Sequence, residues 1–286
     1  MRVRVGVQWA QLDGSHAASQ PVPNEHFVEL QWMRVVVGVN LPLGDGWDLE
    51  LEAPYDVKDV EARYELPDGT PFDNPLGDLH HRTERLEGFS DFLLMASHRP
   101  RDVLLPGDFV RIGLGISLPV GRTEEDPYAL GLLGIKHQHI QFGSGTVYPA
   151  ARLDYAWQPD RIGFDLSLGA RLPFYENADG YLGAGLLEFA AGPRMRLGDG
   201  IHASLHYVAA YQTRATWDGL SDPNTGYVQH AIALAVPVSL GHGVTLIPSV
   251  IRTLDINTRG GGDSYEMDWS ASVGFDVAME TAKIEK

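Results

Sequence analysis

The chain has 286 residues, no cysteine and a formal net charge of −16. Without cysteine it has no disulfide, no thiolate metal ligand and no cysteine nucleophile. The acidic balance argues against nucleic-acid binding, because a phosphate backbone is bound by clustered Lys and Arg. No run of 18 apolar residues occurs, so no transmembrane helix is expected, and the alternating start from Met1 to Val7 shows no signal peptide.

Strict alternation of apolar and polar residues dominates the chain. From Phe109 to Pro119, for example, Val, Ile and Leu alternate with Arg, Gly and Ser. A period of two places these sets on opposite faces of a β-strand. Twelve such strands are predicted in chain order, at about 1–11, 27–43, 47–65, 89–100, 109–121, 147–158, 162–177, 187–197, 201–213, 227–240, 244–256 and 265–277.

The connections between these segments alternate in length. Short turns rich in Gly, Asp and Pro follow the second, fourth, sixth, eighth and tenth segments, as at 44–46 and 198–200. This interleaving predicts antiparallel strands with the long loops at one end and both termini at the short-turn end. The expected long loops are about 12–26, 66–88, 122–146, 178–186, 214–226 and 257–264.

Alternating strands can form a soluble sandwich or barrel with an apolar interior, or a membrane barrel with apolar residues facing lipid. Three features favour the membrane barrel. The polar faces mix Gly, Ser, acids and Arg, aromatic residues gather near strand ends, and an even strand number closes the sheet without an exposed edge. We therefore predict an all-β, closed, up-and-down antiparallel transmembrane barrel of about 12 strands as a single domain over 1–277, with a short polar tail at 278–286.

Five short motifs stand out along the chain. They are GFSD (88–91), GLGISLPVG (113–121), QFGSG (141–145), DPNTG (222–226) and VPV (236–238). They resemble motifs of a known family of bacterial barrels, the one named after the MetA pathway of phenol degradation. The resemblance covers about residues 85–255 and implies a Gram-negative outer-membrane β-barrel of transporter type, related to a trimeric secretion channel for functional amyloid. The chain departs from the family at its end, where Phe275 stands in for the usual terminal aromatic residue.

Charges on the polar faces are the first functional candidates, because a charge at bilayer depth must face inward. One interpretation is a pore with a transverse field, and the other is an interior ion-pair network that fills the barrel. The network would place Arg34 beside Glu50, and Arg2 and Arg4 beside Glu266 and Asp268. The predicted lumen-lining residues are Arg34, Glu50, Glu52, Arg111, Arg152, Asp154, Asp165, Arg171, Glu188, Arg194, Arg196, His202, His206, Glu266 and Asp268, with Arg2, Arg4, Asp48 and Asp91 on the same faces.

Other motifs carry less chemistry. Histidines at 80–81, at 137 and 139, and at 202 and 206 lack a third ligand fixed by spacing, so no metal and no cofactor is predicted. Ser144 lies between two glycines but lacks the G-x-S-x-G elbow, so turn geometry explains the glycines and no enzyme is predicted. The loop stretch 126–136 is apolar, and three alternatives stay open for it: it folds into the mouth as a constriction, it packs on a partner or a neighbouring protomer, or it merely covers the barrel rim.

Together these features predict a channel of the bacterial outer membrane for passive diffusion of small organic solutes, including aromatic or hydrophobic ones. Two alternatives stay open: a secretion pore for a polypeptide or amyloid subunit, and an occluded structural barrel that docks a partner complex. The expected partners are the lipid bilayer, lipopolysaccharide and small-molecule solutes, with a homo-oligomer left open and no nucleic acid.

Overall fold

The computed structural model describes residues 1–18, 21–75, 79, 82–137, 139–258 and 266–279. Within them, antiparallel strands close into a barrel of 12 strand positions, sealed by pairing of β10 with β11. The strands are β1 (Arg2–Ala18), β2 (Asn24–Gly44), β3 (Trp47–Glu65), β4 (Glu84–Phe89), β5 (Phe92–His98), β6 (Phe109–Leu118), β7 (Pro149–Trp157), β8 (Ile162–Arg171), β10 (Leu186–Gly198), β11 (Ile201–Gln212), β14 (Tyr227–Ala235), β15 (Val238–Gly241), β16 (Val244–Thr258) and β17 (Glu266–Ala278). In the ring, β4 and β5 share one position beside β3, and β14 and β15 share one beside β16.

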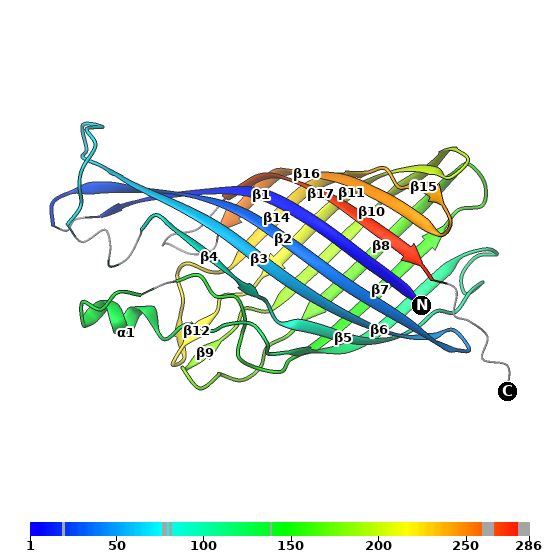
Figure 1. Cartoon of the computed structure of the whole chain (residues 1–286), viewed down its shortest axis with the longest axis horizontal. Helices are drawn as coiled ribbons and strands as arrows, with labels where there is room; N and C mark the ends of the chain where they lie inside the picture. The colour runs from blue at the N-terminus through cyan, green and yellow to red at the C-terminus, as the bar shows by residue number, and fades with distance from the viewer. Residues whose placement is uncertain (19–20, 76–78, 80–81, 138, 259–265, 280–286) are drawn as a thin grey trace.

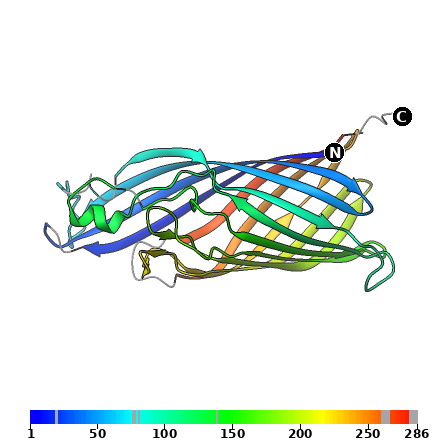
Figure 2. The same ribbon diagram turned by 90° about the horizontal axis from the view of Figure 1, so that it is seen from below.

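The two ends of the barrel differ. The N-terminus lies at one end together with the tight hairpin turns, and α1 (Pro127–Leu132), β9 (Tyr181–Leu182), β12 (Thr216–Trp217) and β13 (Leu220–Ser221) belong to the connections at the other (Figures 1 and 2). The chain ends meet where β1 pairs with β17, since the Met279 amide donates to the Met1 carbonyl at 2.8 Å. Within the described part of the chain, no helix is long and apolar enough to cross a membrane.

Burial alternates along the strands in the sense that is opposite to a soluble protein. On β6, Ile112 and Leu114 are 51% and 68% exposed, whereas Arg111 and Ser117 are 8% and 1% exposed. The polar face is therefore covered by the rest of the barrel, and the aliphatic face is open. A closed all-β barrel with this arrangement of faces is the architecture that the alternation predicts, and the predicted fold class is confirmed.

The predicted long loop at 12–26 is wrong. β1 and β2 remain paired from Arg2 opposite Asn40 as far as Ala18 opposite Asn24, and β3 accompanies them to Glu65. These strands and β4 therefore extend beyond the other strands as a wall on one side of the mouth (Figure 1). We call this extension the rim wall; it comprises residues 12–18, 24–31, 58–65 and 84–89.

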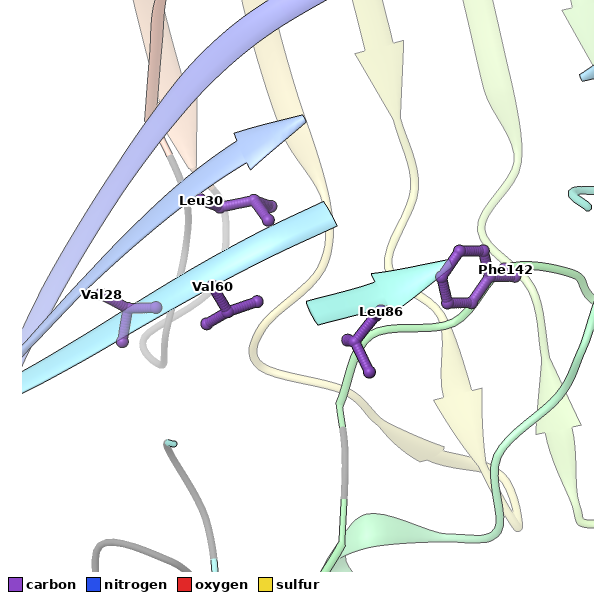
Figure 3. Close-up of a cluster of buried hydrophobic side chains, with 5 residues drawn as sticks. All are labelled: Val28, Leu30, Val60, Leu86 and Phe142. Atoms are coloured by element: carbon purple, nitrogen blue, oxygen red, sulfur yellow. The ribbon is translucent and has the colours of Figure 1, made fainter. Parts of the chain in front are cut away.

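The hairpin at 12–26 escaped prediction because the pattern of the rim wall is inverted relative to the barrel below. Lower on β3, Glu50 and Glu52 share the inner face, but higher on the same face the chain presents Val60. The polar side of this part of the wall faces out, where Asp59 and Glu61 are exposed. Its inner side carries the apolar cluster of Figure 3, formed by Val28, Leu30, Val60, Leu86 and Phe142.

Of the expected tail at 278–286, Ala278 is the last residue of β17 and Met279 follows it, whereas residues 280–286 lie outside the described residues, as do His80 and His81.

Candidate functional site: the barrel interior

A network of ion pairs centred on Arg111 lies inside the barrel near the short-turn end. Arg111 on β6 pairs with Glu50 on β3 and lies 3.6 Å from the Asp48 carboxylate, although β5 stands between these strands. Such a contact forms only on the concave side of the sheet. On the same face of β6, Gly113 leaves room for the Met95 side chain of β5, since a Cβ there would meet the Met95 sulfur at 2.6 Å.

Further charge pairs follow along the interior of β7 to β11. The three arginine pairs join residues on the same or neighbouring strands, and His206 on β11 reaches Asp165 on β8 past β10. Pairs of this kind at partly exposed positions contribute little to stability, but they hold the side chains in place. They are Arg152–Asp154 at 2.8 Å, Arg194–Asp165 and His206–Asp165 at 3.5 Å each, and Arg171–Glu188 at 3.7 Å.

Two of the predicted pairings are wrong. Arg34 pairs with Asp56, at 2.7 and 2.8 Å through two nitrogens, because the register of β2 and β3 sets these residues opposite one another and sets Glu50 opposite Asn40. The sequence offered a signal for this, since Asp56 has the same parity as Glu50.

The second error concerns the seam between β1 and β17. Arg4 lies 3.7 Å from Asp276, because antiparallel pairing brings the start of β1 to the end of β17. Glu266 instead lies opposite Asp13, and Asp268 pairs with Arg252 at 3.3 Å.

The remaining predicted residues fall into different surroundings. Arg196 pairs at 3.6 Å with Asp160, an 89% exposed residue of a turn, so it lies outside the interior network. His202 is half-buried on β11, four residues before His206. Glu52 and Arg152 line a common cavity.

Three cavities follow one another along the barrel axis. The upper cavity, of about 260 Å³, is lined by Arg34, Asp91 and Phe142 on one side and Arg171 on the other. The middle cavity, of about 300 Å³, shares Arg171 with it. The lower cavity, of about 160 Å³, reaches Glu50, Asp154 and the Arg111 network at the short-turn end. Arg171 therefore stands where the upper and middle cavities meet.

An inward segment of the long loop 122–146 lines the upper cavity. The Lys58 ammonium donates to the Gln141 carbonyl at 3.1 Å and lies 4.4 Å from the centre of the Phe142 ring. The Arg122 guanidinium lies 5.2 Å from the same ring. A ring between two cations gains from both, so this residue is fixed over the mouth by charge as well as by packing.

The loop folds inward at a place other than the expected one. The apolar stretch 126–136 forms α1 and the following turn, and it stays outside: Leu132 and Leu133 are 91% and 72% exposed. The part that enters the barrel is 141–146, where Phe142, Ser144 and Thr146 are buried. Sequence reasoning missed this segment for a physical reason. A glycine-rich polar segment enters a barrel only where another part of the chain forms hydrogen bonds with its backbone, and that partner is visible only in the fold.

A second cluster ties the loops of the mouth together. Tyr128 donates to Asp222 at 2.7 Å, and Tyr181 packs on Trp217 with ring centres 4.7 Å apart. Burial, and next the carboxylate of Asp222, raises the pKa of Tyr181, so its hydroxyl stays neutral at physiological pH. Tyr181 also lines the upper cavity.

The contacts of the histidine and serine motifs indicate structural roles. The rings of His137 and His139 lie 5.2 Å apart, and no group of three or more His, Cys, Asp or Glu suited to a metal occurs among the residues that the structure describes. Ser144 donates to Asp91 at 2.7 Å. Gly145 adopts a φ of 69°, so a turn requires the glycine.

Comparison with known proteins is informative about fold. No family model and no curated protein matches the chain. An outer membrane channel from Pseudomonas putida superposes with a TM-score of 0.59 at 11% identity, over 97% of this chain and 95% of the other. The transport unit of the autotransporter AIDA-I from Escherichia coli gives 0.50 at 9% identity, over 97% and 90%.

The NanC porin gives a TM-score of 0.47 at 9% identity, over 94% of this chain and 100% of the other. At such identities the two better matches show that the chain shares the fold of these barrels. The family suggested by the five motifs stays a prediction.

Proposed function

We propose that the chain is a channel of the Gram-negative outer membrane that passes small organic solutes by diffusion. The observation that carries this proposal is the reversed burial of the barrel, with aliphatic side chains outside and three cavities in series inside, each lined in part by charged residues. The aliphatic outer face suits lipid, and a closed barrel leaves no backbone group unpaired there. The fold shared with an outer membrane channel supports the same proposal.

A solute would enter at the long-loop end, pass the inward segment 141–146, and then cross the upper, middle and lower cavities. Paired charges along this path replace part of the hydration of a polar solute without trapping an ion of either sign. Arg171 contacts every solute that crosses from the upper to the middle cavity. Diffusion down a gradient needs no energy coupling.

Cavity size favours small solutes over an extended polypeptide. The cavities measure about 160 to 300 Å³, at or below the lower end of typical pockets for small organic ligands, about 300 Å³. A secreted polypeptide would need a continuous wide path. The preference for aromatic or hydrophobic solutes rests on the motif resemblance, and the lipopolysaccharide and homo-oligomer partners remain proposals.

The test is reconstitution of the purified protein in planar bilayers and in liposomes. The proposal predicts discrete conductance steps, and liposome swelling whose rate falls as the solute grows from about three to ten heavy atoms per molecule, beyond which the cavities are filled. Heat-denatured protein is the control. A folded, inserted protein that leaves the membrane silent would favour the occluded barrel that docks a partner.

A further inference from the structure

Three of the five motif segments meet at one carboxylate. Asp91 ends the GFSD segment and projects between the ends of the other two. Its Oδ1 accepts the Gly121 amide at 3.1 Å, from the end of GLGISLPVG. Its Oδ2 accepts the Ser144 amide at 2.8 Å and the Ser144 hydroxyl at 2.7 Å, from QFGSG. The two bonded residues, Gly121 and Ser144, lie near the two ends of the loop 122–146, which carries the inward segment.

The backbones of the two loop ends touch each other beside this carboxylate. A Cβ on Gly121 would lie 2.6 Å from the Gly143 Cα, and a Cβ on Gly143 would lie 2.5 Å from Asp91 Oδ1. Neither position accommodates a side chain, so both glycines serve the close approach. The Asn177 amide adds a bond of 3.2 Å to the Ser144 carbonyl from the next loop.

The carboxylate also controls what lies over the upper cavity. Asp91, Phe142 and Ser144 all line that cavity, and Phe142 follows directly from the bonded segment. The Phe142 ring packs on Gly88, where a Cβ would lie 3.6 Å from the ring. Movement of residues 143–144 away from Asp91 would therefore carry the ring off the cavity.

We propose that Asp91 is the latch of this channel: by holding Gly121 and Ser144 together, it keeps the segment 141–146 over the upper cavity and sets the closed state. Hydrogen bonds to a carboxylate acceptor are stronger than those between neutral groups, so one carboxylate can hold both loop ends. Release of the latch leaves the barrel wall intact, because the Asp91 bonds described here reach loop residues. The latch rests on the proposed channel function.

The experiment measures access to the interior through a single cysteine. The chain has no native cysteine, and Ala150, 5% exposed, lines the middle cavity beneath the latch. The Ala150→Cys protein is treated with a charged thiosulfonate, and modification is followed by intact-protein mass. Adding Asp91→Asn is expected to raise the modification rate by about tenfold or more, the effect of losing a charged hydrogen bond on a local opening equilibrium.

The control is Asp160→Asn in the same Ala150→Cys background. It removes an exposed carboxylate of a turn, the partner of Arg196 outside the interior network, and the modification rate should stay unchanged. Ser144→Ala removes only the hydroxyl donor and should give a smaller increase. Folding of each variant is checked by heat-modifiable gel migration; if Asp91→Asn does not fold, Ser144→Ala decides the question.

Equal rates in the folded latch variants and the parent would overturn the latch. The mass readout is independent of solute flux. Faster modification in a protein that never conducts would keep the latch and refute the channel. The opposite result is also possible: the parent conducts, and Asp91→Asn and Ser144→Ala change neither the size nor the open probability of the conductance. That result would keep the channel and refute the latch.

Discussion

The lower barrel and the rim wall are built from the same strands but obey opposite patterns. On β3, the inner face carries Asp48 and Glu50 in the lower barrel and Val60 in the rim wall, while the outer face changes from Leu51 to Glu61. In the proposed membrane channel, this change is expected where the surroundings of the outer face pass from lipid to water. One β-strand can therefore continue through the boundary while the side that must be apolar switches.

The largest expected effect comes from placing a charge on the outer face of the lower barrel. Leu114, near the middle of β6, is 68% exposed, and Leu114→Arg should destabilise the folded barrel in lipid by about 2–4 kcal/mol, the cost of a cation near the bilayer midplane. The measurement is the denaturant midpoint in vesicles. The same charge on the rim wall, in Gln31→Arg, should cost almost nothing, and equal costs at both sites would contradict the comparison.

The next effect tests the apolar inner side of the rim wall. Phe142 is 6% exposed in the cluster with Val28 and Leu86, so Phe142→Ala should weaken packing of the loop on the wall by about 3–5 kcal/mol. Limited proteolysis of the loop 122–146 measures this. The matched control is Phe89→Ala, because Phe89 lies on the outer side of β4 and is 48% exposed. If the loop is cleaved faster than in the parent by an equal factor in both variants, the apolar cluster on the inner side of the rim wall does not hold the loop.

A third prediction concerns charge inside the barrel. Arg171 lines both the upper and the middle cavity, and its acidic partner Glu188 is 3.7 Å away. Arg171→Gln leaves that carboxylate uncompensated, so the ratio of cation to anion permeability should rise by about twofold or more. Reversal potentials in a salt gradient measure the ratio. Arg196→Gln removes an arginine paired at an exposed turn and should leave it unchanged; a shift of the same size there would argue for a non-local effect.

The smallest effect concerns the outer side of the rim wall, where acids lie in direct register. Asp13 is opposite Glu29, and Glu29 is opposite Glu61. Like charges directly opposite destabilise a sheet, so Glu29→Gln should stabilise the rim wall by about 0.2–1 kcal/mol. Amide exchange of residues 24–31 measures it. The gain should shrink at about 1 M salt, where charges are screened within about 3 Å, and a gain that persists there would refute the electrostatic cause.

The strands and their order could be predicted from the sequence because the two faces of each strand have different surroundings. Apolar and polar residues therefore alternate, and this alternation can be read in a single sequence. All twelve predicted segments correspond to strand positions of the barrel. The hairpin at 12–26 could not be predicted in this way, because its inverted pattern contains short polar runs that resemble a loop. The partners of the charges depend on register, which is why Arg34 was assigned to Glu50 instead of Asp56.

The meeting of Asp91 with Gly121 and Ser144 lay beyond sequence reasoning for another reason. Its members are 30 and 53 residues apart from the carboxylate along the chain. No local period links a strand end to a loop of this length. The motifs marked the three segments separately, and only the closed barrel brings them together.

The most direct test of the central claim is a spin-label scan along β6 in lipid vesicles. Labels at Ile112, Leu114 and Ile116 should collide with oxygen dissolved in the bilayer, whereas labels at Arg111 and Ser117 should not. This alternation is the predicted result, because the first set is open and the second is covered. Oxygen access at Arg111 and Ser117 with the aliphatic positions shielded would contradict the account.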